Sequence, residues 1–150
     1  TEPRDPAEAR VVAMNALARR EHSASELEQK LARAGFAGEV AAATVATLAG
    51  EGLQSDARFA ESLIASYARR GKGPLRAVHD LGQRGVEAGL IDAALAAAAI
   101  DWHERARDAR TRKFGATPPE DFSDKAKQMR FLRYRGFSSE QIAAALAETP

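Results

Sequence analysis

The feature of this sequence that most constrains its fold is a short pattern that occurs three times. In each copy a leucine is followed four residues later by a glycine and then by a large apolar residue. The copies are Leu31 with Gly35 and Phe36, Leu81 with Gly85 and Val86, and Leu132 with Gly136 and Phe137. The glycines lie 50 and 51 residues apart, a period that suits three short helices per unit. The pattern predicts an all-α protein of three tandem three-helix repeats, elongated and curved like a solenoid, that acts through an extended surface.

The repeats are expected at residues 1–52, 53–101 and 102–150 of one continuous folded unit. Only 6% of the 150 residues are aromatic, so the core has few large anchors. Each repeat should therefore depend on its neighbours for stability.

Cap and glycine signals predict nine helices and no strand. Asp5 and Pro6 begin the first helix, which runs to about Arg20, and Ser23 with Glu26 and Ser138 with Gln141 form capping boxes. The other expected segments are a helix from Ser23 to Gly35, one that closes at Gly50 and Gly52, and helices over 56–70, 74–85, 90–100, 102–113 and 123–135. In the fifth helix Leu75, Val78 and Leu81 are expected on the buried face.

Charge is unevenly distributed although the formal net charge is only +1. Residues 58–85 and residues 124–135 each carry a net +4, whereas residues 86–101 carry −3. Such segregation can create a basic face on a nearly neutral protein, and that face would favour acidic partners.

Several classes of function find no support in the sequence. The chain has no cysteine, and its longest apolar run, residues 93–100, is too short to span a membrane. The three histidines, which lie beside caps or on polar faces, have no ligand-like spacing, and Ser23 and Ser138 read as helix caps rather than nucleophiles. We therefore expect no enzyme, no metal or other cofactor and no membrane contact, in a protein that works in the cytoplasm.

Three segments resemble the RecX regulators of the bacterial recombinase RecA, and the resemblance extends from about Ala13 to the end of the chain. The first segment is Arg20-Glu21-His22-Ser23 with Glu26-Leu27 and Lys30-Leu31. The second is Asp56-Ala57-Arg58-Phe59-Ala60-Glu61 with Gly73 and Leu81-Gly82-Gln83-Arg84-Gly85-Val86. The third is Arg130-Phe131-Leu132-Arg133-Tyr134-Arg135-Gly136-Phe137. Ser55 stands where the family often has Asn or Asp, and serine also caps helices.

The resemblance implies a non-enzymatic protein that lies in the helical groove of the RecA–single-stranded DNA filament. There it would suppress filament growth, ATP hydrolysis and strand exchange. Repeated modules could contact several recombinase subunits at once and multiply modest local affinities.

Two basic clusters are the main candidates for partner contact. The first surrounds the expected break between the fourth and fifth helices, and the second lies on the eighth helix, where aromatic residues alternate with arginines. The selected residues are Arg69, Arg70, Lys72, Arg76 and Arg84 in the first cluster, and Lys127, Arg130, Arg133, Tyr134 and Arg135 in the second. Phosphates or carboxylates could bind the first cluster, and a protein or a base could meet the second. Ordinary capping and solvated arginines are the alternatives.

The seventh helix supplies a second tier of candidates, Arg105, Arg110 and Lys113, on what could equally be a solvated face. The sequence thus favours a monomeric inhibitor of a recombinase filament. It leaves open a helical module that binds single-stranded DNA directly and competes for it.

Overall fold

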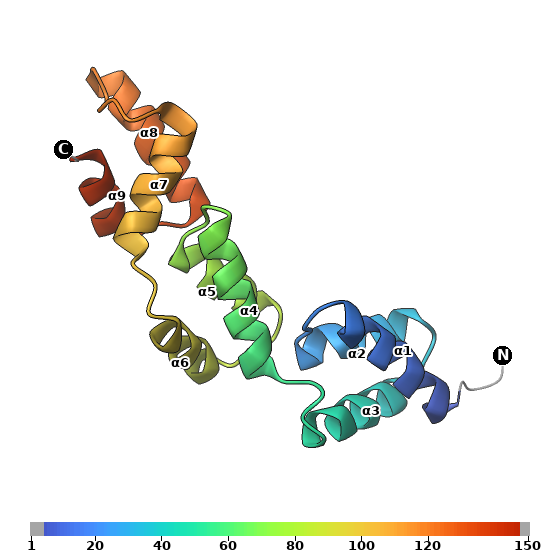
Figure 1. Ribbon diagram of the computed structural model, residues 1–150. Helices are drawn as coiled ribbons and strands as arrows, with labels where there is room; N and C mark the ends of the chain where they lie inside the picture. The colour runs from blue at the N-terminus through green and yellow to red at the C-terminus, as the bar shows by residue number, and fades with distance from the viewer. Residues whose placement is uncertain (1–4, 148–150) are drawn as a thin grey trace. The chain divides into compact units, whose positions relative to one another are not determined.

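The computed structural model describes residues 5–147, which form nine α-helices and no strand (Figure 1). The helices are α1 (Pro6–Arg19), α2 (Ala24–Arg33), α3 (Gly38–Gly50), α4 (Asp56–Arg69), α5 (Pro74–Gln83), α6 (Ala88–Ala98), α7 (Trp102–Phe114), α8 (Phe122–Arg135) and α9 (Ser139–Leu146). The all-α class and the succession of helices are confirmed over this range. The elongated, curved form stays a prediction.

The repeated leucine–glycine pattern is a helix-ending motif. Gly35, Gly85 and Gly136 all have positive φ, at 101°, 80° and 101°. Residues with a side chain rarely adopt this backbone conformation. The amide of the apolar residue after each glycine donates to the carbonyl of the repeated leucine, at N···O distances of 3.1, 3.1 and 3.2 Å for Phe36, Val86 and Phe137. The three leucines are fully buried. The pattern therefore specifies the same helix end after a buried leucine in each of the three copies.

The predicted helix starts are also confirmed. Asp5 accepts a hydrogen bond from the Ala7 amide, and Pro6 is the first helical residue. Both capping boxes are formed, at Ser23 with Glu26 and at Ser138 with Gln141. Each cap satisfies amide groups that the helix itself leaves without partners.

Residue contacts divide the chain into two compact units. Unit 1 contains residues up to Ser62 together with Leu81–Asp92, and unit 2 contains Leu63–Asp80 together with the chain from Ala93 onward. The division passes through α4, α5 and α6, so the middle helices contribute residues to both units. The repeat boundaries expected from the sequence stay a prediction.

In unit 1, α1, α2 and α3 (blue to teal in Figure 1) pack around a core of small and aliphatic side chains. Leu27, Leu31 and Leu48 are fully buried in this core, next to alanines of α1. Hydrogen bonds also join the start of α2 to the start of α4 and to the residue after α5, which belong to the same unit. The Asp56 carboxylate accepts from the Ala24 amide at 2.8 Å, and the Ser23 hydroxyl donates to the Arg84 carbonyl at 2.7 Å.

His22 lies beside the helix cap Ser23, as expected, and its side chain is buried, with 1% of its surface exposed. Its Nδ1 lies 3.0 Å from the Arg20 carbonyl oxygen and its Nε2 lies 3.0 Å from the Lys30 ammonium. These partners suit a neutral ring that donates through Nδ1 and accepts through Nε2. Burial lowers the pKa of His22, and the charges of Arg20 and Lys30 lower it further.

This environment predicts a loss of stability on mild acidification. The unfolded chain takes up a proton at His22 near pH 6.5, its ordinary pKa, whereas the folded chain takes it up only at lower pH. The free energy of unfolding should therefore fall as pH drops from about 7.5 to about 5.5. Urea unfolding of the wild type and of His22→Asn at both pH values checks this, and an equal loss of stability in the two proteins would contradict it.

Glu26 does not contribute to this change between about pH 7.5 and about pH 5.5. Burial raises the pKa of its carboxyl group, but hydrogen bonds from Arg20 and from the Ser23 amide lower it more, so the net shift is downward from 4.5.

In unit 2, α7, α8 and α9 (orange to red in Figure 1) surround a second core. Leu132, Phe137 and Ile142 are its largest buried members, and Trp102 packs against it partly buried. Asp101 caps α7, and Asp121 caps α8, which begins one residue earlier than expected.

The expected buried stripe of α5 is wrong in two of its three positions. Leu75 is 56% exposed and Val78 is 39% exposed, whereas Ala77 and Leu81 are fully buried. The reason is that the backbone at Gly73, just before α5, lies very close to the backbone at Gly136. A Cβ atom on Gly73 would come within 3.0 Å of Gly136. Ala77 lies one turn after Gly73, so this face of the helix carries small residues.

Candidate partner interface

The turn between α4 and α5 meets the C-terminal end of α8 within unit 2. The Gly73 amide donates to the Arg135 carbonyl at 2.8 Å, and the Leu75 amide donates to the Gly136 carbonyl at 3.0 Å. The Arg135 guanidinium in turn donates to the carbonyl oxygens of Gly71, at 3.0 Å, and of Arg70. Arg70 and Arg135, which belong to different predicted basic clusters, are therefore joined by a hydrogen bond from the Arg135 side chain to the Arg70 carbonyl.

Lys72 lies near these cations, and its ammonium group contacts the ring of Tyr67. Its ammonium is 4.7 Å from the centroid of the Tyr67 ring, and the Arg70 guanidinium is 5.2 Å from the same ring. The Tyr67 hydroxyl donates to the Asp80 carboxylate at 2.5 Å. Burial lowers the pKa of Lys72, as do the charges of Arg70, Arg76 and Arg135. Three neighbouring cations thus disfavour the charged form of Lys72, and the Asp80 carboxylate favours it.

Arg76 connects α5 to the aromatic residue of the second cluster. Its guanidinium donates to the Tyr134 carbonyl at 3.2 Å, lies 5.5 Å from the Tyr134 ring centroid, and pairs with Asp80 at 3.6 Å. The Tyr134 side chain is nevertheless 73% exposed. An exposed aromatic residue next to an arginine is typical of a residue that a partner protein buries.

A cationic pocket of about 290 Å³ opens between the end of α4, the end of α7 and α8. Its lining residues, which define the cationic pocket from here on, are Arg70, Gly71, Ala109, Arg112, Lys113, Phe131 and Arg135. Arg112 and Phe131 were not selected from the sequence. The spacing of Ala109, Arg112 and Lys113 could have revealed the face, because residues three and four positions apart share one side of a helix.

Arg110, selected as a second-tier contact, is instead an internal residue. It is only 2% exposed. Its guanidinium donates to the Gln128 side-chain oxygen at 2.8 Å and to the Thr117 carbonyl at 2.6 Å. These bonds anchor the loop before α8 and compensate the burial of the charge. Arg110 therefore cannot contact a partner through its charged group, and we no longer count it among the candidate contact residues.

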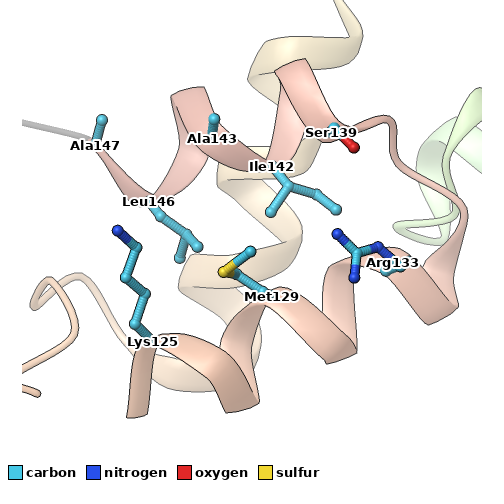
Figure 2. Close-up of a pocket in the computed structure, with 8 residues that line it drawn as sticks. All are labelled: Lys125, Met129, Arg133, Ser139, Ile142, Ala143, Leu146 and Ala147. Atoms are coloured by element: carbon cyan, nitrogen blue, oxygen red, sulfur yellow. The ribbon is translucent and has the colours of Figure 1, made fainter. Parts of the chain in front are cut away.

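Arg133 points away from the cationic pocket toward α9. Figure 2 shows Lys125 and Arg133 on either side of Met129, facing Ile142 and Leu146 across an apolar pocket. This pocket has a volume of about 360 Å³ and its floor is formed by α8 and α9. Arg133 and Arg135, only two positions apart, thus belong to different surfaces of the same helix.

The remaining candidates are placed as follows. Arg69, Arg105, Lys127 and Arg130 are exposed. Arg84 belongs to unit 1, where it pairs with Glu26 at 3.8 Å.

No group of three or more potential metal ligands gathers in the part of the chain that the structure describes. No helix within residues 5–147 is long and apolar enough to cross a membrane.

Family models match three successive parts of the chain. Residues 9–48 match the model described as RecX, first three-helix domain, residues 55–95 match the second three-helix domain, and residues 100–146 match the third. Together the matches span most of the chain, and each contains one copy of the leucine–glycine motif.

Relatives of similar length carry the name Regulatory protein RecX. The protein from Pseudomonas fluorescens is 45% identical over 92% of this chain and 89% of its own length. Those from Halorhodospira halophila and Ectopseudomonas mendocina are 45% and 44% identical, over 92% and 95% of this chain and 86% and 95% of their own.

Two crystal structures share the fold. RecX from Lactobacillus salivarius superposes with a TM-score of 0.76 at 19% identity, over 95% of this chain and 94% of that one. A second structure, described as regulatory protein RecX, has a TM-score of 0.80 at 23% identity, over 95% and 73%. At these identities the likeness concerns the fold alone.

Proposed function

Because the chain belongs to the RecX family, we propose that it is a negative modulator of the RecA recombinase. In this proposal it binds in the groove of the RecA–single-stranded DNA filament and inhibits filament growth, ATP hydrolysis and strand exchange. It acts in the cytoplasm as a monomer and needs no cofactor.

The family is one of regulatory proteins and not of enzymes. The nucleotide chemistry in this proposal therefore belongs to the recombinase. The contribution of this chain is binding, which must stabilise a form of the filament that grows or turns over more slowly.

The observation that carries the proposal is the gathering of Arg70, Lys72 and Arg135 at the turn between α4 and α5, with Arg76 of α5 against the exposed Tyr134. The Arg135 guanidinium is held in place because it donates to the carbonyl oxygens of Gly71 and Arg70, so this side chain loses little conformational freedom when a partner binds. Acidic groups of a filament, either carboxylates or phosphates, fit this surface. Arg69, Lys127, Arg130 and Arg105 extend the proposed contact area, and Arg133 adds a contact beside the apolar pocket of Figure 2.

A second candidate function is direct binding to single-stranded DNA, with inhibition by competition for it. The cationic pocket favours it, because exposed arginines that lack carboxylate partners serve phosphates as well as they serve proteins. The two functions differ in whether the recombinase is needed for binding.

One comparison tests both. We expect the chain to sediment with recombinase filaments that are assembled on DNA with a slowly hydrolysed nucleotide analogue. Its affinity for these filaments should exceed its affinity for the same DNA alone at the same salt. Equal binding to bare DNA and to filaments would favour the competitor. Absence of binding to filaments would contradict the proposed function.

A further inference from the structure

The apolar pocket between α8 and α9 lies wholly within unit 2 and has a volume of about 360 Å³. Met129 of α8 faces Ile142 and Leu146 of α9 across it (Figure 2). Ile142 and Leu146 are buried members of the second core, and Met129 packs against that core half-buried. Pockets of about 300 Å³ and more hold ligands in other proteins. This pocket is therefore large enough to receive a large apolar side chain from a partner.

Two cations lie at opposite ends of the apolar pocket. Lys125, Met129 and Arg133 follow one another at intervals of four residues on α8, so they share one face of the helix. Figure 2 shows Lys125 and Arg133 on either side of Met129. Between these two cations the helix advances by about 12 Å. The pocket thus combines an apolar centre with a positive charge at each end.

Neither of these two cations has a partner in the part of the chain that the structure describes. Both side chains are exposed. Within residues 5–147 neither Lys125 nor Arg133 donates a hydrogen bond or forms an ion pair. A ligand that covers the pocket removes water from both charged groups, which is unfavourable unless the ligand supplies acceptors for them. A carboxylate opposite each cation supplies such acceptors.

This charge pattern distinguishes among the occupants that an apolar pocket can take. A fatty acid carries one carboxylate and would leave one of the two cations without a partner. A symmetric dimer through this pocket would bring Lys125 and Arg133 of one copy against those of the other, and like charges repel. A peptide with an acidic residue on each side of an apolar residue matches the centre and both ends.

We propose that the apolar pocket binds a helical segment of a partner protein in which an apolar side chain lies between two carboxylates, four positions away on each side. In such a segment the three side chains share one helix face and advance along the axis as Lys125, Met129 and Arg133 do. The apolar side chain enters the pocket, and the carboxylates pair with Lys125 and Arg133. An amphipathic helix in a groove is a common mode of peptide recognition. The inference goes beyond the proposed function, because this binding needs neither recombinase nor DNA.

The test uses a fluorescently labelled, alanine-rich helical peptide with glutamate, leucine and glutamate at successive fourth positions. The full chain is titrated into it at low salt, and binding is followed by fluorescence anisotropy. One control peptide has alanine in place of the leucine, and another has lysines in place of the two glutamates. The variant Lys125→Glu/Arg133→Glu reverses both charges of the pocket. The matched control Lys127→Glu/Arg130→Glu reverses two charges at exposed positions of α8 outside the pocket lining. Circular dichroism and thermal unfolding establish that both variants keep the fold.

We expect the wild type to bind the glutamate peptide, and to bind the alanine control about tenfold more weakly because no leucine side chain is buried. The pocket variant should bind the glutamate peptide at least about tenfold more weakly and should bind the lysine peptide instead, since its charges are reversed. The control variant should bind like the wild type. Equal binding of the leucine and alanine peptides, or equal weakening in both variants, would overturn the proposal.

Two further measurements address the other occupants. Binding of decanoate without binding of the glutamate peptide would assign the pocket to a fatty acid and overturn the proposal. Self-association of the wild type that is lost in Lys125→Glu/Arg133→Glu, again without peptide binding, would assign it to a second copy of the chain and overturn it as well. Loss of peptide binding in the pocket variant while filament binding persists supports the proposal and leaves the proposed function standing, so the two can fail separately.

Discussion

Replacing Gly73 with alanine is expected to lower the free energy of unfolding by about 3 kcal/mol, a loss larger than its single methyl group suggests. The added Cβ would lie within 3.0 Å of the carbonyl carbon and oxygen of Gly136 and of the Phe137 amide nitrogen. These are backbone atoms and cannot rotate away. Relief of the clash must separate the two segments and weaken the hydrogen bonds from the Gly73 and Leu75 amides.

A second glycine provides the matched control for this substitution. Gly82 lies in α5, and a Cβ atom added there would meet no atom within 4 Å. Gly82→Ala should therefore raise stability by about 0.5–1 kcal/mol through helix propensity. Urea unfolding of both variants measures the contrast. Equal stabilities of Gly73→Ala and the wild type would show that α5 and the end of α8 do not approach as closely as the structure has them.

Local signals in the sequence predicted most of the secondary structure. The capping boxes, Pro6 and the three repeated glycines act within a few residues of the backbone they control, so their effects can be inferred from spacing alone. For the same reason the helix ends were predicted to within a few residues.

Features that depend on the approach of distant segments could not be predicted in this way. The burial of Ala77 in place of Leu75 follows from the contact between Gly73 and Gly136, which are far apart in the chain. The roles of Arg110 and Arg135 have a similar origin. Their charges look alike in the sequence, but one anchors an internal loop and the other caps the carbonyl groups at the end of α4. Charge counts located the basic region without showing which cations remain available to a partner.

The second large effect is expected from charge reversal in the first basic cluster. Arg69→Glu/Arg70→Glu should weaken binding to recombinase filaments about a hundredfold, since two attractive contacts with an acidic surface become repulsive. Both side chains are exposed, so the helical fold should persist. Arg19→Glu/Arg33→Glu, which changes the net charge equally on exposed positions in unit 1, should bind like the wild type. Equal weakening in both variants would indicate a general charge effect rather than a contact surface.

Inhibition of DNA-dependent ATP hydrolysis by the cognate recombinase tests the central claim most directly. The account predicts that the wild-type chain reduces the rate at amounts comparable to or below those of the recombinase, and hydrolyses no ATP by itself. Arg69→Glu/Arg70→Glu should require about a hundredfold more protein for the same reduction. Full ATP hydrolysis at saturating wild-type chain, under conditions where binding to the filament is established, would contradict the account.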